Sequence, residues 1–290
     1  MKSITYKEFP CDVCLSDDAV EVPHSRFYTA GEPIYICKEC GFVYVKKRRS
    51  AQKIADVWSD ELYGANYTAH SPHVLARQTF VADFIDMHLR LRGKTLVDIG
   101  AGEGQFLDIA KNGKYGAQVF GIEPSKRNCH LLGKMGIDYF HGNLESFLKS
   151  ADSKKIKADI VTLMWTLENC QNPRAILAGA HKLLKDGGHV VIATGSRILV
   201  PFKKPLHMYI SKNPTDTHSS RFSANALQGL LAAAHFEKKY INQFIDNDIL
   251  CVIGQKKPVS SKIKAPTDNY LDVYSFFDRW HTDTQMYFRP

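Results

Sequence analysis

Apolar runs and helical stripes alternate through the middle of the chain, and this alternation predicts a fold class before any motif is considered. Short apolar runs rich in β-branched residues predict strands at 95–99, 118–122, 138–140, 158–163 and 188–194. Helical periodicity lies between them, at 104–112, 125–135 and 173–184. That order is typical of an α/β protein, in which helices cover both faces of a parallel sheet.

Further elements are predicted on either side of this core. A helical stripe covers residues 72–91, and the runs 236–244 and 249–255 flank D-N-D at 246–248, which indicates a hairpin. Near the end, an aromatic stripe at helical spacing comprises Leu271, Tyr274, Phe277 and Trp280. We interpret that stripe as a helix docked on the chain's own domain, with a dimer contact or a lid over the substrate as alternatives.

The composition is that of a soluble protein with room for one large domain and a small appendage. The chain has 290 residues, of which 44% are hydrophobic and 23% charged. Its net charge of +8 is compatible with nucleic acid, anionic lipid or a nucleotide-linked substrate, and it selects none of them. Residues 1–8 lack the apolar segment of a signal peptide, and no run approaches the roughly 20 residues of a membrane span. We therefore expect a cytoplasmic protein.

Four of the seven cysteines form two C-x-x-C pairs separated by 22 residues, Cys11 with Cys14 and Cys37 with Cys40. Four thiolates from such pairs make a closed tetrahedral zinc site, so the sequence predicts a structural zinc ribbon without catalytic water. The remaining cysteines are expected as small core residues; they are Cys129, Cys170 and Cys251. The basic run at 46–49 is interpreted as a solvated linker, with phosphate contacts to nucleic acid as the alternative.

Residues 95–104, T-L-V-D-I-G-A-G-E-G, predict a strand that enters a glycine turn and then a helix. The dinucleotide pattern G-x-G-x-x-G is not met, because Gln105 stands where its third glycine is required. Asp98 at the strand's end would repel a pyrophosphate but suits a cationic amino group. Glu123 ends the next apolar run, where an acid can bind both ribose hydroxyls. Together these features predict S-adenosylmethionine as the cofactor.

Five segments, in order and at normal spacing, resemble the motifs of class I S-adenosylmethionine-dependent methyltransferases. They are D-I-G-A-G-E-G at 98–104, G-I-E-P-S at 121–125, G-N-L-E at 142–145, D-I-V-T-L-M-W-T-L-E-N at 159–169 and L-L-K-D-G-G-H-V-V-I at 183–192. The chain departs from the family at Asn143, often Asp, at Asn169, usually His, and at Asp186, usually Pro. The resemblance covers about 94–257 and implies a Rossmann-like seven-stranded sheet with one antiparallel strand.

The resemblance also implies which residues bind the cofactor. Glu123 would hold the ribose, Asn143 and Leu144 would touch the adenine, and Asp98 would order the glycine turn and favour the cation. The full expected set is Tyr63, Asp98, Gly100, Ala101, Gly102, Gly104, Glu123, Pro124, Asn143, Leu144 and Trp165.

On the acceptor side, Tyr67 and His70 precede the leading helix, and His218 lies in a segment similar to the family's acceptor loop. His218 is our first choice of base, because imidazole titrates near working pH.

We expect three parts, a zinc ribbon at 1–50, a methyltransferase domain at 51–257 and a linker with a helical tail at 258–290. A zinc segment ahead of such a domain resembles bacterial enzymes that methylate sugars. The members of that group that methylate carbon have a large additional carboxyl-terminal domain, and we expect this sequence to be too short to contain one. We therefore expect methylation of a hydroxyl or amino group of a sugar, nucleotide-sugar, glycan or other small molecule. The alternatives are an rRNA or tRNA methyltransferase that binds RNA through the ribbon and the basic run, and a non-catalytic scaffold. No membrane span is expected, and the tail is a candidate homodimer contact.

Overall fold

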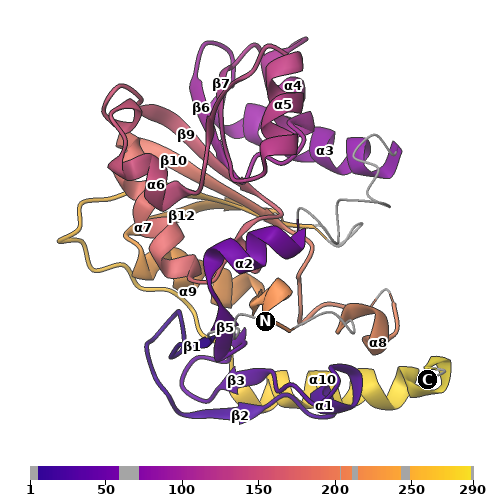
Figure 1. The fold of residues 1–290 in the computed structure, drawn as a ribbon. Helices are drawn as coiled ribbons and strands as arrows, with labels where there is room; N and C mark the ends of the chain where they lie inside the picture. Colours follow the sequence, from indigo (N-terminus) through magenta and orange to yellow (C-terminus); the bar gives the residue numbers. More distant parts are fainter. Residues whose placement is uncertain (1–5, 59–71, 203, 211–214, 243–248, 289–290) are drawn as a thin grey trace.

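The computed structural model describes residues 6–58, 72–202, 204–210, 215–242 and 249–288 (Figure 1). Seven strands form one mixed sheet in the order β12-β13-β10-β9-β6-β7-β8. Their bounds are β6 Thr95–Ile99, β7 Gln118–Glu123, β8 Asp138–His141, β9 Ala158–Met164, β10 Leu184–Thr194, β12 Phe236–Ile241 and β13 Leu250–Lys256. β13 runs antiparallel to both of its neighbours, β10 and β12. The expected α/β class and the seven-stranded sheet with an antiparallel strand are confirmed.

Helices cover both faces of this sheet, and the alternation of side chains along each strand supplies two separate cores. In β6, Leu96 packs on one face with Val81 of α3, whereas Val97 packs on the other face with Leu177 of α7. Strands buried on both faces are apolar nearly throughout, which explains the continuous apolar runs in the sequence. The helices are α3 Pro72–Leu89, α4 Gln105–Lys111, α5 Lys126–Lys134, α6 Leu144–Lys149, α7 Pro173–Leu183 and α9 Ala224–Ala233, with 3₁₀ turns η2 Asp152–Lys154 and η3 Leu167–Asn169.

The amino-terminal segment forms two small sheets beneath the large one (Figure 1). β1 Tyr6–Glu8 pairs with β5 Lys47–Arg49, and a second sheet has the order β11-β4-β3-β2. Its strands are β2 Ala19–Glu21, β3 Tyr35–Cys37, β4 Val43–Tyr44 and β11 Ser220–Arg221, and the short helix α1 Ser25–Tyr28 follows β2. Since β11 comes from far along the chain, the amino-terminal ribbon and the part of the chain that forms the large sheet share this small sheet.

The basic run at 46–49 is not a solvated linker, contrary to expectation. Arg48 is 0% exposed and Arg49 is 7% exposed, and both lie in β5. Arg48 forms an ion pair with Asp12 at 2.6 Å, and Arg49 forms one with Asp216 at 2.6 Å. A buried guanidinium needs a carboxylate partner, and here each partner comes from another segment of the chain.

The carboxyl-terminal helix α10 Tyr270–Thr284 packs against β3 of the ribbon and against α8 Leu206–Tyr209. Its buried face contains only part of the predicted stripe: Phe277 and Trp280 are buried, whereas Leu271 and Tyr274 are 55% and 38% exposed. The buried side chains are Val273, Phe276, Phe277 and Trp280, which join a third core with residues of the ribbon. Helix α2 Ala51–Asp56 and two 3₁₀ turns, η4 Thr215–His218 and η5 Gln285–Tyr287, complete the described elements. Among the described residues, no helix combines the length and apolar character needed to cross a bilayer.

Candidate active site and cysteine cluster

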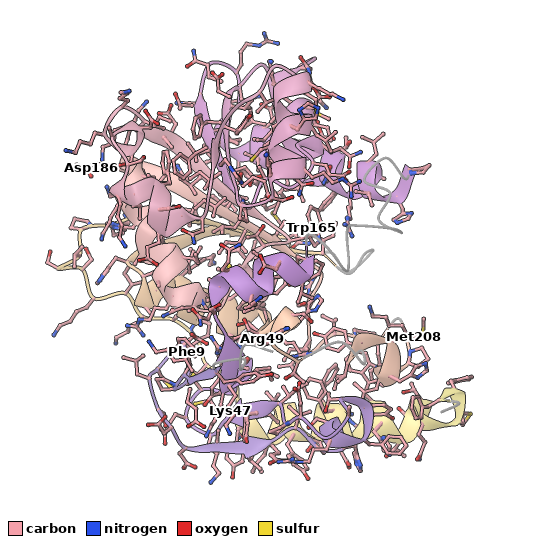
Figure 2. The ribbon with its side chains drawn as sticks, viewed as in Figure 1. Phe9, Lys47, Arg49, Trp165, Asp186 and Met208 are labelled. Carbon is pink, nitrogen blue, oxygen red and sulfur yellow. The ribbon has the colours of Figure 1, made fainter. Side chains whose placement is uncertain are left out.

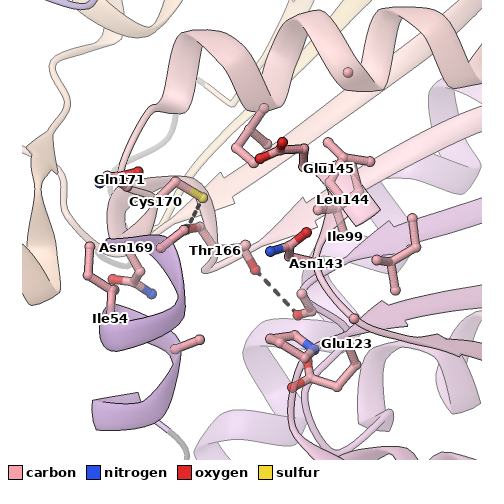
Figure 3. Close-up of a pocket in the computed structure, with 18 of the residues that line it drawn as sticks. Ile54, Ile99, Glu123, Asn143, Leu144, Glu145, Thr166, Asn169, Cys170 and Gln171 are labelled. Carbon is pink, nitrogen blue, oxygen red and sulfur yellow. Dashed lines mark hydrogen bonds between the residues drawn. The ribbon is translucent and has the colours of Figure 1, made fainter. Parts of the chain in front are cut away.

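A cavity of about 510 Å³ opens at the carboxyl ends of β6, β7 and β9 (Figure 3). Ile99, Glu123 and Met164, the last residues of these strands, all line it. Helix α2 Ala51–Asp56 covers the cavity on the side opposite Ile99 and Leu144 (Figure 3). Open α/β sheets bind ligands at this edge, so the cavity is the candidate cofactor site.

Two glycines of the turn after β6 are sterically required. A Cβ built on Gly100, which has φ +75°, would lie 2.6 Å from Thr166 Cγ2, and one on Gly104, φ +86°, would lie 2.5 Å from Leu132 Cδ2. Both positions also have the left-handed backbone that side chains disfavour. The turn therefore lies directly against its neighbours and presents backbone to the cavity.

Glu123 is held rigidly at the end of β7. Its Oε2 accepts a hydrogen bond from the Gly102 backbone N–H at 2.8 Å, and Oε1 accepts one from the Ser125 N–H at 2.9 Å. The side chain is 5% exposed, and burial raises the pKa of the carboxyl group. Oε1 also accepts a longer hydrogen bond from Asn128 Nδ2 at 3.4 Å, whereas Oε2 has one donor and keeps acceptor capacity for a ribose hydroxyl.

The structure brings most of the predicted cofactor residues together. Those that line the cavity are Gly100, Gly102, Glu123, Pro124, Asn143, Leu144 and Trp165. Asn143 also caps α6, because its Oδ1 accepts from the Ser146 N–H at 2.9 Å. Ala101 and Gly104 belong to the turn but do not line the cavity, and Tyr63 lies outside the described residues.

Asp98 differs from its expected role. It is 1% exposed beneath the turn, does not line the cavity, and accepts a hydrogen bond from Thr162 Oγ1 at 2.7 Å. Burial raises the pKa of Asp98 to about 8, although the hydrogen bond from Thr162 by itself lowers that pKa. The Asp98 side chain therefore joins β6 to β9 beneath the turn and does not face the cavity, where we expected it to favour a cation.

On the acceptor side, Tyr67 and His70 lie outside the described residues. His218 ends η4, and its ring meets that of Trp58 edge-on at 5.5 Å between centroids. Burial lowers the pKa of His218 to about 3, with further effects of Arg221 and Lys204. A neutral imidazole with a lowered pKa is a weaker proton acceptor, and the role of His218 as base stays a prediction.

Two features of the site were missed from the sequence. Helix α2 and the residue two positions after its end present apolar side chains to the cavity: Ala51, Ile54, Ala55 and Trp58. Their spacing of i, i+3, i+4 and i+7 is a helical signal that the sequence contains. Glu168 in η3 is 3% exposed, and burial raises its pKa to about 7. No sequence pattern distinguishes such a buried acid from a surface one.

The four predicted zinc ligands converge beside β3. Their Sγ atoms all lie within 4.8 Å of one another, with Cys11 to Cys40 at 3.5 Å and Cys14 to Cys37 at 3.4 Å. Tetrahedral zinc with Zn–S bonds of about 2.3 Å separates its sulfurs by about 3.8 Å, so the cluster has suitable dimensions for that ion. Gly41, φ +70°, turns the chain after Cys40. The donor set is closed and leaves no position for a substrate.

Comparisons with known proteins agree with this geometry. The profile of a family described as "Methyltransferase domain" matches residues 74–240. Curated relatives include the ubiquinone biosynthesis O-methyltransferases of Aromatoleum aromaticum, 33% identical over 40% of this chain and 50% of the relative, and of Paraburkholderia phytofirmans, 36% identical over 39% and 50%. The chain spans about half the length of the curated relatives that it matches.

Solved structures of methyltransferases share the fold. An S-adenosylmethionine-dependent methyltransferase of Thermotoga maritima superposes with a TM-score of 0.50 at 19% identity, over 70% of this chain and 100% of that one. Magnesium protoporphyrin IX methyltransferase of Synechocystis, solved with bound S-adenosylhomocysteine, gives 0.50 at 12% identity, over 72% and 100%. At these identities the likeness establishes the fold alone.

Proposed function

The chain belongs to the family of methyltransferase domains, and we propose that it transfers the methyl group of S-adenosylmethionine to a hydroxyl or amino group of a small molecule. The observation that supports this most directly is Glu123, which accepts a hydrogen bond from the Gly102 N–H and lines a 510 Å³ cavity. Sugars, nucleotide-sugars and glycans are the acceptor class that we propose. The names of the curated relatives favour oxygen as the acceptor atom.

The residues of the cavity would act by positioning. S-adenosylmethionine supplies an electrophilic methyl group, and the transfer is an in-line displacement in which alignment of donor and acceptor provides much of the rate. Glu123 would hold the ribose, and Asn143 with Leu144 would contact the adenine. Helix α2 would exclude water from the side that Ile54 and Trp58 line.

An oxygen acceptor must lose its proton in or near the transition state. Tyr67 and His70 stay predictions for that step. His218 is disfavoured as the base by its low pKa. Glu168, whose pKa is about 7, has suitable acidity, but it does not line the cavity.

The RNA alternative has lost part of its basis. It required the basic run to contact phosphates, but Arg48 and Arg49 are buried in ion pairs with Asp12 and Asp216. Salt-dependent RNA binding remains the test that separates the two functions. Contacts to RNA phosphates release counterions, so the affinity for RNA should fall as the salt concentration rises, whereas an enzyme for a small acceptor should show no such dependence.

Calorimetric titration with S-adenosylmethionine tests the proposal. Glu123→Ala should abolish binding, whereas Glu237→Ala on the edge strand β12 is the matched control and should bind as wild type does. Wild-type affinity in Glu123→Ala would refute the cofactor site. Formation of S-adenosylhomocysteine on addition of candidate sugars would then identify an acceptor and exclude the non-catalytic scaffold.

A further inference from the structure

Four arginines are buried in the part of the chain that the structure describes, and they fall into two pairs. Arg48 and Arg49 each face a buried carboxylate at ion-pair distance. Arg197 and Arg221 are 9% and 4% exposed, and no carboxylate of the described residues lies within ion-pair distance of either. An unpaired buried charge is costly, so these two arginines need a different explanation from the first pair.

Arg197 lines a second, smaller cavity of about 50 Å³. Its Nη1 donates to the Ile249 carbonyl at 3.0 Å, while its buried Nε has no hydrogen-bond partner among the described residues. The same cavity is lined by Lys204 and by aromatic rings, those of Phe202, Tyr209, Phe276 and Trp280. It therefore has cations and apolar walls, but no acidic side chain lines it.

Arg221 and Lys204 both lie against Tyr209, a wall of this cavity. The Arg221 Cζ is 5.8 Å from the centre of the Tyr209 ring, and the Lys204 Nζ is 5.6 Å from it. Arg221 Nη1 also donates to the His218 carbonyl at 3.1 Å. Arg221 does not itself line the small cavity. Cation–π contacts at these distances compensate a guanidinium only in part, so Arg221 still contributes positive charge next to the Tyr209 wall.

The small cavity lies next to the proposed methyl-donor site. Gly195, which lines it, follows β10, and a Cβ built there would lie 3.6 Å from Trp165 Nε1. Trp165 in turn lines the large cavity and lies at the carboxyl end of the sheet (Figure 2). A molecule in the small cavity would thus approach the donor past the indole of Trp165.

We propose that Arg197 and Lys204, which line the small cavity, bind an oxyanion of the acceptor, a phosphoryl or carboxylate group, beside Trp165 and outside the methyl-donor cavity. Arg221, which contacts the Tyr209 wall, adds positive charge to this site. Guanidinium groups bind both kinds of oxyanion through paired N–H donors. A cavity of about 50 Å³ accommodates one such group and not a whole substrate. The identification of the ligand as the acceptor rests on the proposed function, whereas the anion site itself does not.

The low pKa of His218 agrees with this positive environment. Burial is its main cause, and the charges of Arg221 and Lys204 lower it further. A bound oxyanion would offset those two charges and make His218 more basic only when an acceptor is present. The sequence signal was weak, because arginines that bind an anion look no different in a sequence from those that pair with Asp12 or Asp216.

Thermal unfolding of the full chain with inorganic phosphate, with acetate and with chloride at equal ionic strength tests the site. A bound ligand stabilises the native state in proportion to the logarithm of its concentration. We expect phosphate or acetate to raise the Tm of the wild type above its value in chloride, and the more effective of the two identifies the oxyanion. Arg197→Met and Arg221→Met should lose that increase, while the exposed Arg279→Met on α10 should keep it.

Both variants remove an uncompensated charge, so their Tm without anion should equal or exceed that of the wild type. The exposed Lys204→Met supplies a test that does not depend on core packing, and it should reduce the increase. An equal increase in Arg197→Met, Arg221→Met and wild type, or no increase in the wild type, would overturn the proposal. Calorimetric titration of the wild type with S-adenosylmethionine is a separate measurement. If it detects no binding, the methyltransferase function is refuted, and the result for the anion site is unaffected.

Discussion

The Nη1 atom of Arg48 donates a hydrogen bond to the Gln171 carbonyl at 2.6 Å and so joins the cysteine cluster to the wall of the large cavity. Arg48 also binds Asp12, which lies between Cys11 and Cys14, through two further hydrogen bonds. Gln171 lines the cavity and returns a bond from its side-chain Nε2 to the Arg49 carbonyl at 2.8 Å. The ribbon therefore supports the loop after β9 and is not an independent appendage.

Arg48→Met should destabilise the protein severely. The substitution would leave the Asp12 carboxylate, 3% exposed, without its partner, which costs about 3–5 kcal/mol in comparable buried pairs. Urea unfolding followed by circular dichroism measures the change. Lys47→Met is the control, because Lys47 is 70% exposed and its pair with Glu8 contributes roughly 0–1 kcal/mol. Equal effects of the two substitutions would contradict the role given to Arg48.

Metal analysis of the purified chain should find zinc bound to the four-cysteine cluster. Cys11→Ser should lose the metal, because thiolates from all four positions complete the tetrahedron. Cys251→Ser replaces an equally buried thiol in β13 and should retain it. Chelation should lower the Tm, and it should also weaken S-adenosylmethionine binding through the contact between Arg48 and Gln171. Full metal content in Cys11→Ser would refute the site.

The central sheet was predictable because its strands are buried on both faces and its turn needs glycine. The run 95–99 coincides with β6, and Gly100 and Gly104 have the conformations and close contacts that exclude other residues. Glu123 was predictable for a similar reason, since its place at the end of β7 follows from the strand itself. The strand, the glycine turn and the acid at the end of β7 are all determined by short segments of the sequence within a single sheet.

The remaining errors concern residues whose role depends on distant partners. Arg48 and Arg49 look like a solvated run until Asp12 and Asp216 are brought to them. Asp98 looks like a ligand for a cation, but Thr162 and the surrounding core bury it. Leu271 and Tyr274 have the spacing of a buried stripe, yet the ribbon contacts the neighbouring face of the helix. A single sequence contains no signal for these contacts.

Asp98→Asn should alter how stability depends on pH. The pKa of Asp98 rises from 3.8 to about 8 on folding, so its favourable contribution is complete below pH 3.8 and is lost as the pH rises to about 8. The variant keeps the acceptor for Thr162 and should therefore gain stability relative to wild type across this interval, on the order of a few kcal/mol at its upper end. Urea unfolding at a series of pH values measures the difference, with the exposed Asp272→Asn as control. Parallel curves for Asp98→Asn and wild type would contradict the shift.

His218 should remain neutral from pH 8 down to pH 5, because burial and the charges of Arg221 and Lys204 lower its pKa to about 3. Nitrogen chemical shifts of its ring, assigned with His218→Gln, report the protonation state directly. The exposed His73 of α3 provides a comparison in the same sample. Titration of the His218 ring above pH 5 in the absence of anions would refute the lowered pKa and strengthen this residue as a candidate base.

Trp280→Ala should loosen the ribbon, because this side chain is 3% exposed and its Nε1 donates to the Lys204 carbonyl at 2.8 Å. Large-to-small substitutions of buried aromatic residues cost about 3–5 kcal/mol, and the loss should appear as faster hydrogen exchange in β3, which α10 contacts. Tyr274→Ala on the exposed face should leave exchange unchanged. Unchanged exchange in Trp280→Ala would show that the helix does not hold the ribbon in place.

Sedimentation tests the predicted homodimer. If the tail joins two chains, Tyr274→Ala must weaken their association, because the ribbon already covers the helix face that contains Trp280.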